Sequence, residues 1–164
     1  MIFKFLSKNF YISFSIVALI YFLDRLTKIF VIQLDKNNLG SDIFNSTYLN
    51  VVLIWNKGIA FGLFSFDEVF LYNILSLIIS IIIIILVIMS LKNKGFRRYL
   101  LLMIVGGALG NLHDRIFFKA VPDFIDLHIN DFHWFIFNVS DIFITFGVIL
   151  LIMLEIISNK KEKL

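Results

Sequence analysis

The sequence predicts an all-α polytopic membrane protein that crosses the bilayer four times. Of its 164 residues, 60% are hydrophobic and only 16% are charged, and one is proline. A soluble domain averages about 45–50% apolar and about 25% charged residues. The apolar residues also gather into four long segments, each close to the ~20 residues of helix that span the ~30 Å hydrocarbon core of a bilayer. Composition and segment length together exclude an ordinary soluble domain.

We assign a single domain to 1–164, with outer loops at 35–68 and 119–137 and transmembrane helices at approximately 10–34, 69–91, 99–118 and 138–158. In the first loop, Thr47–Trp55 is rich in β-branched and aromatic residues, which favours a strand. Gly62–Phe66 is apolar and aromatic and is expected in the membrane interface. The second loop carries another aromatic set, 132–135, suited to headgroup depth.

Basic residues set the expected orientation. Only Lys36, Lys57 and Lys119 fall in the two outer loops. The opposite side holds Lys4, Lys8, Lys92, Lys94, Arg97, Arg98, Lys160, Lys161 and Lys163. Cytoplasmic loops carry an excess of lysine and arginine, so both termini are predicted to be cytoplasmic. The net charge of +3 reflects these loops, and we expect no nucleic-acid partner.

Polar side chains from separate parts of the chain are predicted to meet near the outer surface. Asp24 and Lys28 are four residues apart, on one helix face, and close enough to form an ion pair. The other members of this set are Asn111, Asp114, Arg115, Asp123, Asn138 and Asp141. Charged residues in or beside a membrane span are costly to insert, which makes each of them a functional candidate.

Asp123 and Asp141 offer hydrolytic chemistry. Two carboxylates held close together share a proton and titrate as a pair. The ionised member can act as a general base on water, while the protonated member polarises a carbonyl and then protonates the leaving amine. This is peptide hydrolysis by an aspartic dyad. The structural alternative is that each carboxylate caps a helix or joins an ion pair.

Glycines and histidines carry further expectations. Gly106 and Gly110 form a G-x-x-x-G spacing, which usually marks close helix packing. The chain has no cysteine, and its three histidines lack the HExxH spacing of a zinc protease. A chance metal site from Asp126, His128, Asp131 and His133 is the less favoured reading. We therefore expect no metal and no other cofactor.

Five motifs in order resemble the lipoprotein signal peptidases, or signal peptidase II, of bacterial cytoplasmic membranes. The segments are Asp24–Lys28 (D-x-x-T-K), Asn56–Phe61 (N-x-G-x-A-F), Gly106–Arg115 (G-G-A-x-G-N-x-x-D-R), Val121–Ile125 (V-x-D-F-I) and Phe137–Asp141 (F-N-x-A-D). Length and helix number are also similar to those of the family. The resemblance covers nearly the whole chain.

The resemblance implies an aspartic endopeptidase that removes signal peptides from prolipoproteins, just before a diacylglyceryl-modified cysteine. It implies Asp123 and Asp141 as the catalytic pair. The supporting positions it implies are Asp24, Lys28, Asn56, Gly58, Asn111, Asp114, Arg115 and Asn138. It further implies globomycin-type inhibitors, contact with membrane lipid, a small extracytoplasmic β-sheet cradle with an interfacial helix, and an active site at the outer leaflet. We expect a monomer.

Two residues depart from the family pattern. Pro122 stands where the family usually has an aliphatic residue, and it would hold Val121 in extended geometry. Ser140 replaces the usual alanine before Asp141. Its hydroxyl could bond a carboxylate or cap the helix. Neither change removes a reacting group.

Two other classes of function remain for comparison. A proton- or cation-coupled transporter would use Asp24, Asp114 and Asp141 as a relay, but transporters tend to be built from repeats and to bind near the midplane. The sequence has no visible repeat, and the acids cluster at one face. A structural subunit would merely pair its charges, and two uncompensated aspartates beside the outer loops would then be unexplained.

Overall fold

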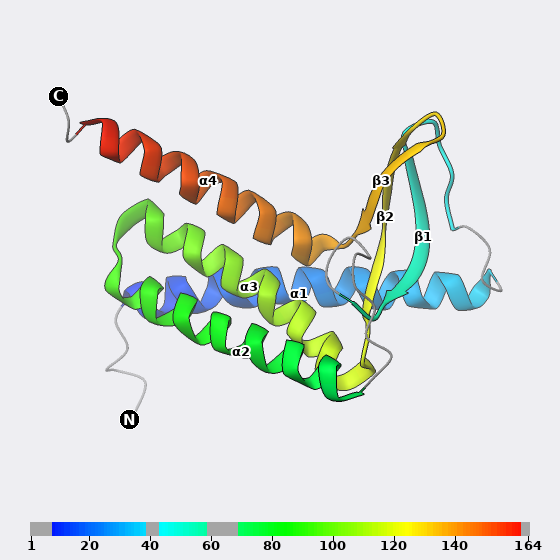
Figure 1. Ribbon diagram of the computed structural model, residues 1–164, viewed down its shortest axis with the longest axis horizontal. Helices are drawn as coiled ribbons and strands as arrows, with labels where there is room; N and C mark the ends of the chain where they lie inside the picture. Colours follow the sequence, from blue (N-terminus) through cyan, green and yellow to red (C-terminus); the bar gives the residue numbers. More distant parts are fainter. Residues whose placement is uncertain (1–7, 39–42, 59–68, 162–164) are drawn as a thin grey trace.

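Four long helices run alongside one another, and a three-stranded sheet stands near one end of them, where the first helix continues past it (Figure 1). This is a computed structural model, which describes residues 8–38, 43–58 and 69–161. The described elements are, in order, α1 (Lys8–Asn37), β1 (Leu49–Asn56), α2 (Val69–Lys92), α3 (Gly95–Phe118), β2 (Val121–Ile129), β3 (Phe132–Phe137) and α4 (Val139–Lys161).

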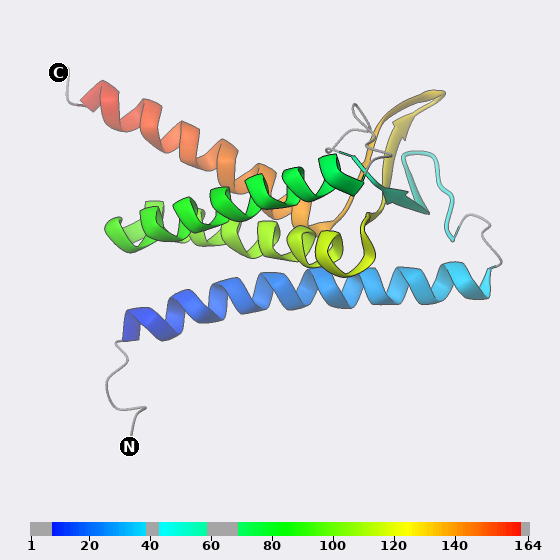
Figure 2. The same ribbon diagram turned by 60° about the horizontal axis from the view of Figure 1, so that its bottom comes forward.

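Helix α3 is the centre of the helical part, because it contacts each of α1, α2 and α4. Three helices of the described chain are long and apolar enough to cross a membrane: Tyr72–Lys92, Gly95–Phe118 and Val139–Ser158. In α2 and α4, only 11% of the most apolar stretch is buried inside the protein, against 61% in α3. The exposed isoleucines of α2 would be unfavourable in water and are suited to lipid. Helix α1 has 30 residues and lies on the side of α3 opposite to α2 (Figure 2).

Glycines let α3 approach two neighbours closely. A Cβ atom at Gly106 would crowd α1, and one at Gly107 would lie 2.6 Å from the backbone oxygen of Ser140 on α4. A Cβ atom at Gly110 would lie 2.3 Å from Ser140 Oγ and 2.5 Å from Asp24 Oδ2. Gly110 therefore sits where α1, α3 and α4 meet. The packing role expected of this glycine series is consistent with these contacts.

The sheet joins the two long connections of the chain. Its order is β1-β2-β3, with both pairs antiparallel. Strand β1 agrees with the strand expected near 47–55, whereas β2 and β3 occupy a loop for which we expected only interfacial aromatic residues. The central strand tolerates Pro122 because β3 pairs with β2 only from Ile125 onward. No residue of β3 therefore needs a backbone N–H from position 122. The interfacial segment expected at 62–66 lies outside the described residues.

Candidate active site

A buried cluster of charges joins α1 to α3. The ammonium group of Lys28 lies 2.9 Å from Asp24 Oδ2 and 2.7 Å from Asp114 Oδ2. It also donates to Asn111 Oδ1 at 2.9 Å. Asp24, Lys28 and Asp114 are all fully buried. The i,i+4 pair expected from the sequence is therefore present, and a second helix completes it. Buried charges are tolerated when they are paired and hydrogen-bonded in this way.

Asp123 lies near the start of β2, between two asparagine amides. Its Oδ2 accepts from Nδ2 of Asn56 on β1 at 2.9 Å, and its Oδ1 accepts from Nδ2 of Asn138 at 2.6 Å. The side chain of Asn56 is itself held, because its Oδ1 accepts the backbone N–H of Gly58 at 2.8 Å. Both strands and the beginning of α4 thus position this carboxyl group.

Asp141 lies in the first turn of α4 and forms a reciprocal cap with Asn138. The Asp141 N–H donates to Asn138 Oδ1 and the Asn138 N–H donates to Asp141 Oδ2, both at 3.1 Å. This is the arrangement of a capping box, with asparagine and aspartate as its two members. Asp141 Oδ1 also accepts from Asn111 Nδ2 at 2.8 Å. The capping role considered as the alternative for Asp141 is therefore present, and its carboxyl group is also bonded to α3 through Asn111.

Asn138 contacts both carboxyl groups, since its side-chain amide donates to Asp123 Oδ1 and its backbone N–H donates to Asp141 Oδ2. Burial, and then the charge of Asp141, raise the pKa of Asp123 to about 6. A carboxyl group with this pKa exchanges its proton near neutral pH, as a general acid or base requires. The charge of Asp141 thus acts directly on the proton affinity of Asp123.

The raised pKa of Asp123 predicts a pH-dependent stability difference. The folded protein binds this proton more tightly than the unfolded chain, whose carboxyl has the ordinary pKa of 3.8. The resulting stabilisation is fully present below that pH and is lost as the pH rises through about 6. Between pH 4 and 8 the wild type should lose about 2–3 kcal/mol relative to Asp123→Asn. Thermal unfolding of both proteins in detergent across this range measures the difference; parallel curves would contradict it.

Ser140 links the acid pair to the charge cluster through its backbone. Its N–H donates to Asp24 Oδ1 at 3.0 Å, so the first turn of α4 is tied to α1. The hydroxyl behaves differently from both expectations: Ser140 Oγ is buried and has no hydrogen-bond partner among the described residues. It neither bonds a carboxylate nor caps the helix.

A Ser140→Ala substitution should therefore stabilise the protein. A buried hydroxyl without a partner costs about 1–3 kcal/mol, and alanine removes that hydroxyl without adding an atom. We expect a gain of about 1 kcal/mol with cleavage unchanged. Denaturant titration in detergent measures the gain, and a loss of stability would show that the hydroxyl has a partner in the folded protein.

The site residues predicted from the sequence lie together in the structure, and Arg25 joins them. Arg115 makes few contacts within this set. Its Nη1 donates to the backbone oxygen of Asn111 at 3.2 Å, and its Nε has no hydrogen-bond partner among the described residues. Arg25 was not predicted as a site residue. Its Nη1 lies 2.6 Å from Asp114 Oδ1, and its Nη2 lies 3.0 Å from Asp24 Oδ2. A second cation adjoining Asp24 inside a membrane helix was the signal for it.

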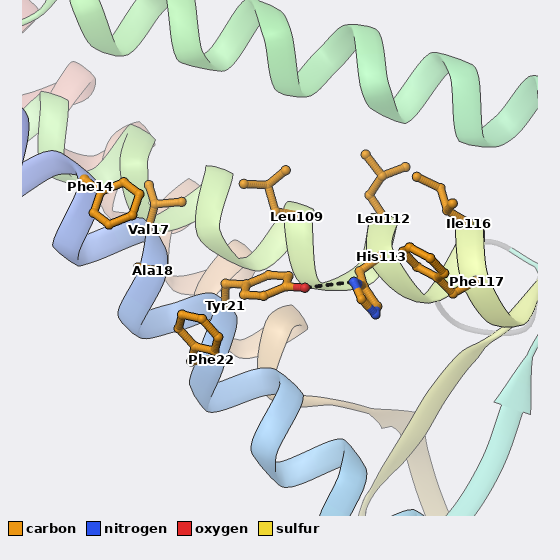
Figure 3. A pocket seen from close by; sticks show the side chains of 10 residues that line it. All are labelled: Phe14, Val17, Ala18, Tyr21, Phe22, Leu109, Leu112, His113, Ile116 and Phe117. Atoms are coloured by element: carbon orange, nitrogen blue, oxygen red, sulfur yellow. Dashed lines mark hydrogen bonds between the residues drawn. The ribbon is translucent and has the colours of Figure 1, made fainter.

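An apolar cavity of about 420 Å³ lies apart from the acids, between α1 and α3 (Figure 3). Phe14, Tyr21 and Phe117 line it, and the Tyr21 hydroxyl shares a 2.8 Å hydrogen bond with His113 Nδ1. Neither Asp123 nor Asp141 lines this cavity. His113 also lines this cavity, and its ring lies against that of Phe117.

Comparison with known proteins identifies the family. A sequence model described as signal peptidase (SPase) II matches residues 16–157. The chain belongs to the signal peptidase II family. It is 50% identical to the lipoprotein signal peptidase of Pelagibacter ubique (strain HTCC1062), over 94% of this chain and 93% of the relative. It is 43% identical to that of Anaplasma phagocytophilum (strain HZ), over 88% of this chain and 92% of the relative.

Solved structures agree with this assignment. A bacterial membrane enzyme matches with a TM-score of 0.73 and 29% identity, over 93% of this chain and 91% of that one. A second bacterial membrane enzyme matches with a TM-score of 0.72 and 32% identity, over 86% and 90%. The prediction of a membrane peptidase of the signal peptidase II family is confirmed. With three helices able to cross a bilayer, the chain is a bacterial membrane protein.

Proposed function

We propose that this chain removes the signal peptide from diacylglyceryl-modified prolipoproteins, with Asp123 and Asp141 as the catalytic pair. The observation that carries the proposal is the arrangement around Asn138, whose side chain touches Asp123 and caps the turn that contains Asp141. The two carboxyl groups come from β2 and α4 and are held by amides, and within the described part of the chain neither forms an ion pair with lysine or arginine.

The proposed chemistry divides two roles between the two acids. Asp123 has a pKa of about 6 and can hold the shared proton. Ionised Asp141 removes a proton from water, and the resulting hydroxide attacks the scissile carbonyl, which protonated Asp123 polarises. Collapse of the tetrahedral intermediate breaks the C–N bond. The proton taken from water then reaches the departing amine, and the pair returns to its starting state.

The supporting residues have two tasks in this proposal. Asn56, Asn111 and Asn138 orient the carboxyl groups through the bonds described above, and Gly58 orients Asn56. Asp24, Lys28 and Asp114 hold α1 against α3, with Arg115 at the edge of the same region. A rigid outer set of contacts keeps the reacting groups within the narrow range of geometry that catalysis needs.

Membrane placement completes the proposal. α1 acts as the fourth transmembrane helix, both termini are cytoplasmic, and the sheet and acid pair lie at the outer leaflet of the cytoplasmic membrane. The excess of basic residues at the opposite ends of the helices supports this orientation. A lipid-anchored precursor would present its cleavage site at the same depth, and the protein would act as a monomer in contact with membrane lipid.

A gel-shift assay tests the function. The purified full-length protein in detergent is mixed with a diacylglyceryl-modified precursor and, in parallel, with the same precursor lacking the lipid. We expect cleavage of the lipidated form alone, and inhibition by globomycin. Equal cleavage of both forms would contradict the proposed substrate class, and undiminished cleavage with globomycin would contradict the proposed inhibitor.

A further inference from the structure

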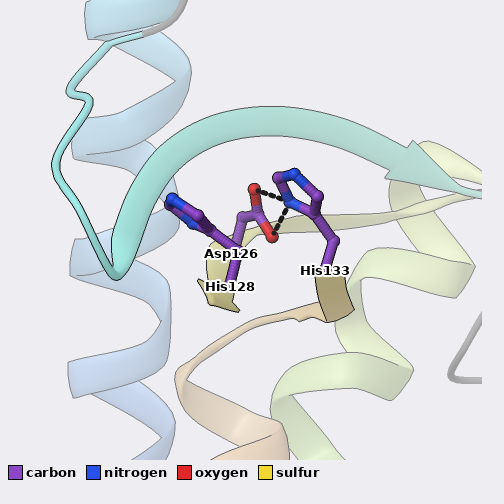
Figure 4. A group of neighbouring side chains, drawn as sticks. All are labelled: Asp126, His128 and His133. Carbon is purple, nitrogen blue, oxygen red and sulfur yellow. Dashed lines mark hydrogen bonds and ion pairs between the residues drawn. The ribbon is translucent and has the colours of Figure 1, made fainter. Parts of the chain in front are cut away.

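Three side chains able to bind metal share one face of the β2–β3 hairpin, near its turn (Figure 4). His128 on β2 is the direct cross-strand partner of His133 on β3. Asp126 precedes His128 by two residues on the same strand. Alternate side chains of a strand point to one face, and cross-strand partners share that face. Backbone geometry therefore brings a carboxylate and two imidazoles together.

Their distances are close to those of a metal site. One ligand atom from each residue lies within 4.8 Å of the other two. His133 Nδ1 is 2.8 Å from Asp126 Oδ2, and the rings of His128 and His133 stack with centroids 4.9 Å apart. Ligands bound tetrahedrally to zinc at about 2.1 Å are about 3.4 Å from one another. The three ligand atoms thus lie within about 1.5 Å of the separations that a tetrahedral zinc site needs.

Two of the three side chains have unused bonding capacity. His128 Nδ1 is buried and has no hydrogen-bond partner among the described residues. Asp126 is only 4% exposed, and apart from His133 its carboxylate meets a long 3.4 Å contact from Asn50 on β1. A buried polar atom without a partner is costly, and a bound cation would satisfy it. Asn50 would then orient a ligating carboxylate from outside the ligand set.

We propose that Asp126, His128 and His133 bind a divalent transition-metal ion of the zinc type, with water in the fourth position. Imidazole nitrogen and carboxylate oxygen are ordinary zinc ligands, and a site with three protein ligands keeps one position open. The ion would link β2 to β3 close to the turn at Asn130. Asp123 lies three residues earlier on β2, about 10 Å along the strand and on its opposite face. The site is thus structural and separate from the proposed hydrolytic pair.

Zinc binding to the full-length protein tests this inference. The protein is purified in detergent with a tag that contains no histidine, stripped with a chelator, and titrated with zinc in competition with a chromophoric indicator. We expect about one ion per chain for the wild type and less than a tenth of that for the His128→Ala/His133→Ala double variant. His113→Gln, which removes the histidine outside the cluster, should bind as the wild type does. Asn50→Ala should bind about tenfold more weakly.

Cobalt substitution gives a second readout that needs no variant. Bound Co²⁺ in the wild type should show visible absorption bands of a site with nitrogen and oxygen ligands, and added zinc should abolish them. Zinc should also raise the melting temperature of the wild type and not that of the double variant. Equal zinc binding by the double variant, or the absence of binding by the wild type, would overturn the proposal and leave His133 and Asp126 as a simple hydrogen-bonded pair.

Discussion

Asp123→Asn and Asp141→Asn should each lower the rate of precursor cleavage by about 10³-fold or more while leaving a folded membrane protein. Asparagine has nearly the shape of aspartate, but it cannot take a proton from water or return one to the leaving amine. Proton transfer by positioned side chains contributes about 10²–10⁴-fold to catalysis, and here both acids act in the same step. Initial rates on a lipidated precursor in the gel-shift assay provide the measurement.

Asp126→Asn is the matched control for this pair. Asp126 is on the same strand as Asp123 and is equally buried, with both side chains 4% exposed. It is absent from the hydrogen bonds around Asn138. Because Asp126 is also a proposed metal ligand, wild type and variant are compared after treatment with a chelator, and the substitution should then leave cleavage within a few-fold of the wild type. Turnover near the wild-type rate in either active-site variant would remove that residue from the catalytic pair. Loss of activity in the control would instead point to the sheet as a whole.

Asp24→Ala should cause the largest loss of stability, about 3–5 kcal/mol, which is typical when one partner of a buried ion pair is removed. The substitution takes a carboxylate from Lys28 and Arg25 and leaves the Ser140 N–H without its acceptor. Both cations would then depend on Asp114. Equilibrium unfolding in detergent at constant pH measures the loss, with cleavage by the remaining folded fraction as a second readout.

Asp35→Ala provides the control for Asp24→Ala. Asp35 is an acidic residue of the same helix that is only partly buried, and a substitution of this kind usually changes stability by less than about 0.5 kcal/mol. Equal effects of the two substitutions would contradict the structural role of the charge cluster. A folded Asp24→Ala protein that binds the precursor and does not cleave it would assign Asp24 to the chemistry instead.

Local sequence patterns accounted for much of this fold. The four apolar segments predicted the four helices to within a few residues, because hydrophobic length is a property of the chain itself. The spacing of Asp24 and Lys28 predicted their ion pair, because residues four apart lie on one face of a helix. The family motifs indicated which acids to examine, although their role as a catalytic pair stays a prediction.

Contacts between distant segments were harder to predict. Strand β2 pairs with β1 across about seventy residues, and its acids and Pro122 disguise the alternation of an ordinary strand. The bidentate contact of Arg25 with Asp114 depends on how α1 is rotated against α3. The isolation of the Ser140 hydroxyl likewise depends on how α4 packs against α1 and α3. None of these can be read from spacing along one element.

The double duty of Asn138 makes the start of α4 a weak point of the molecule. The residue closes the first helical turn and grips Asp123 with the same amide group. Fraying of a single turn would thus take one hydrogen bond from each acid at the same time, leaving Asp123 to Asn56 and Asp141 to Asn111. A compound that wedges this turn open would disable the enzyme without having to resemble its peptide substrate.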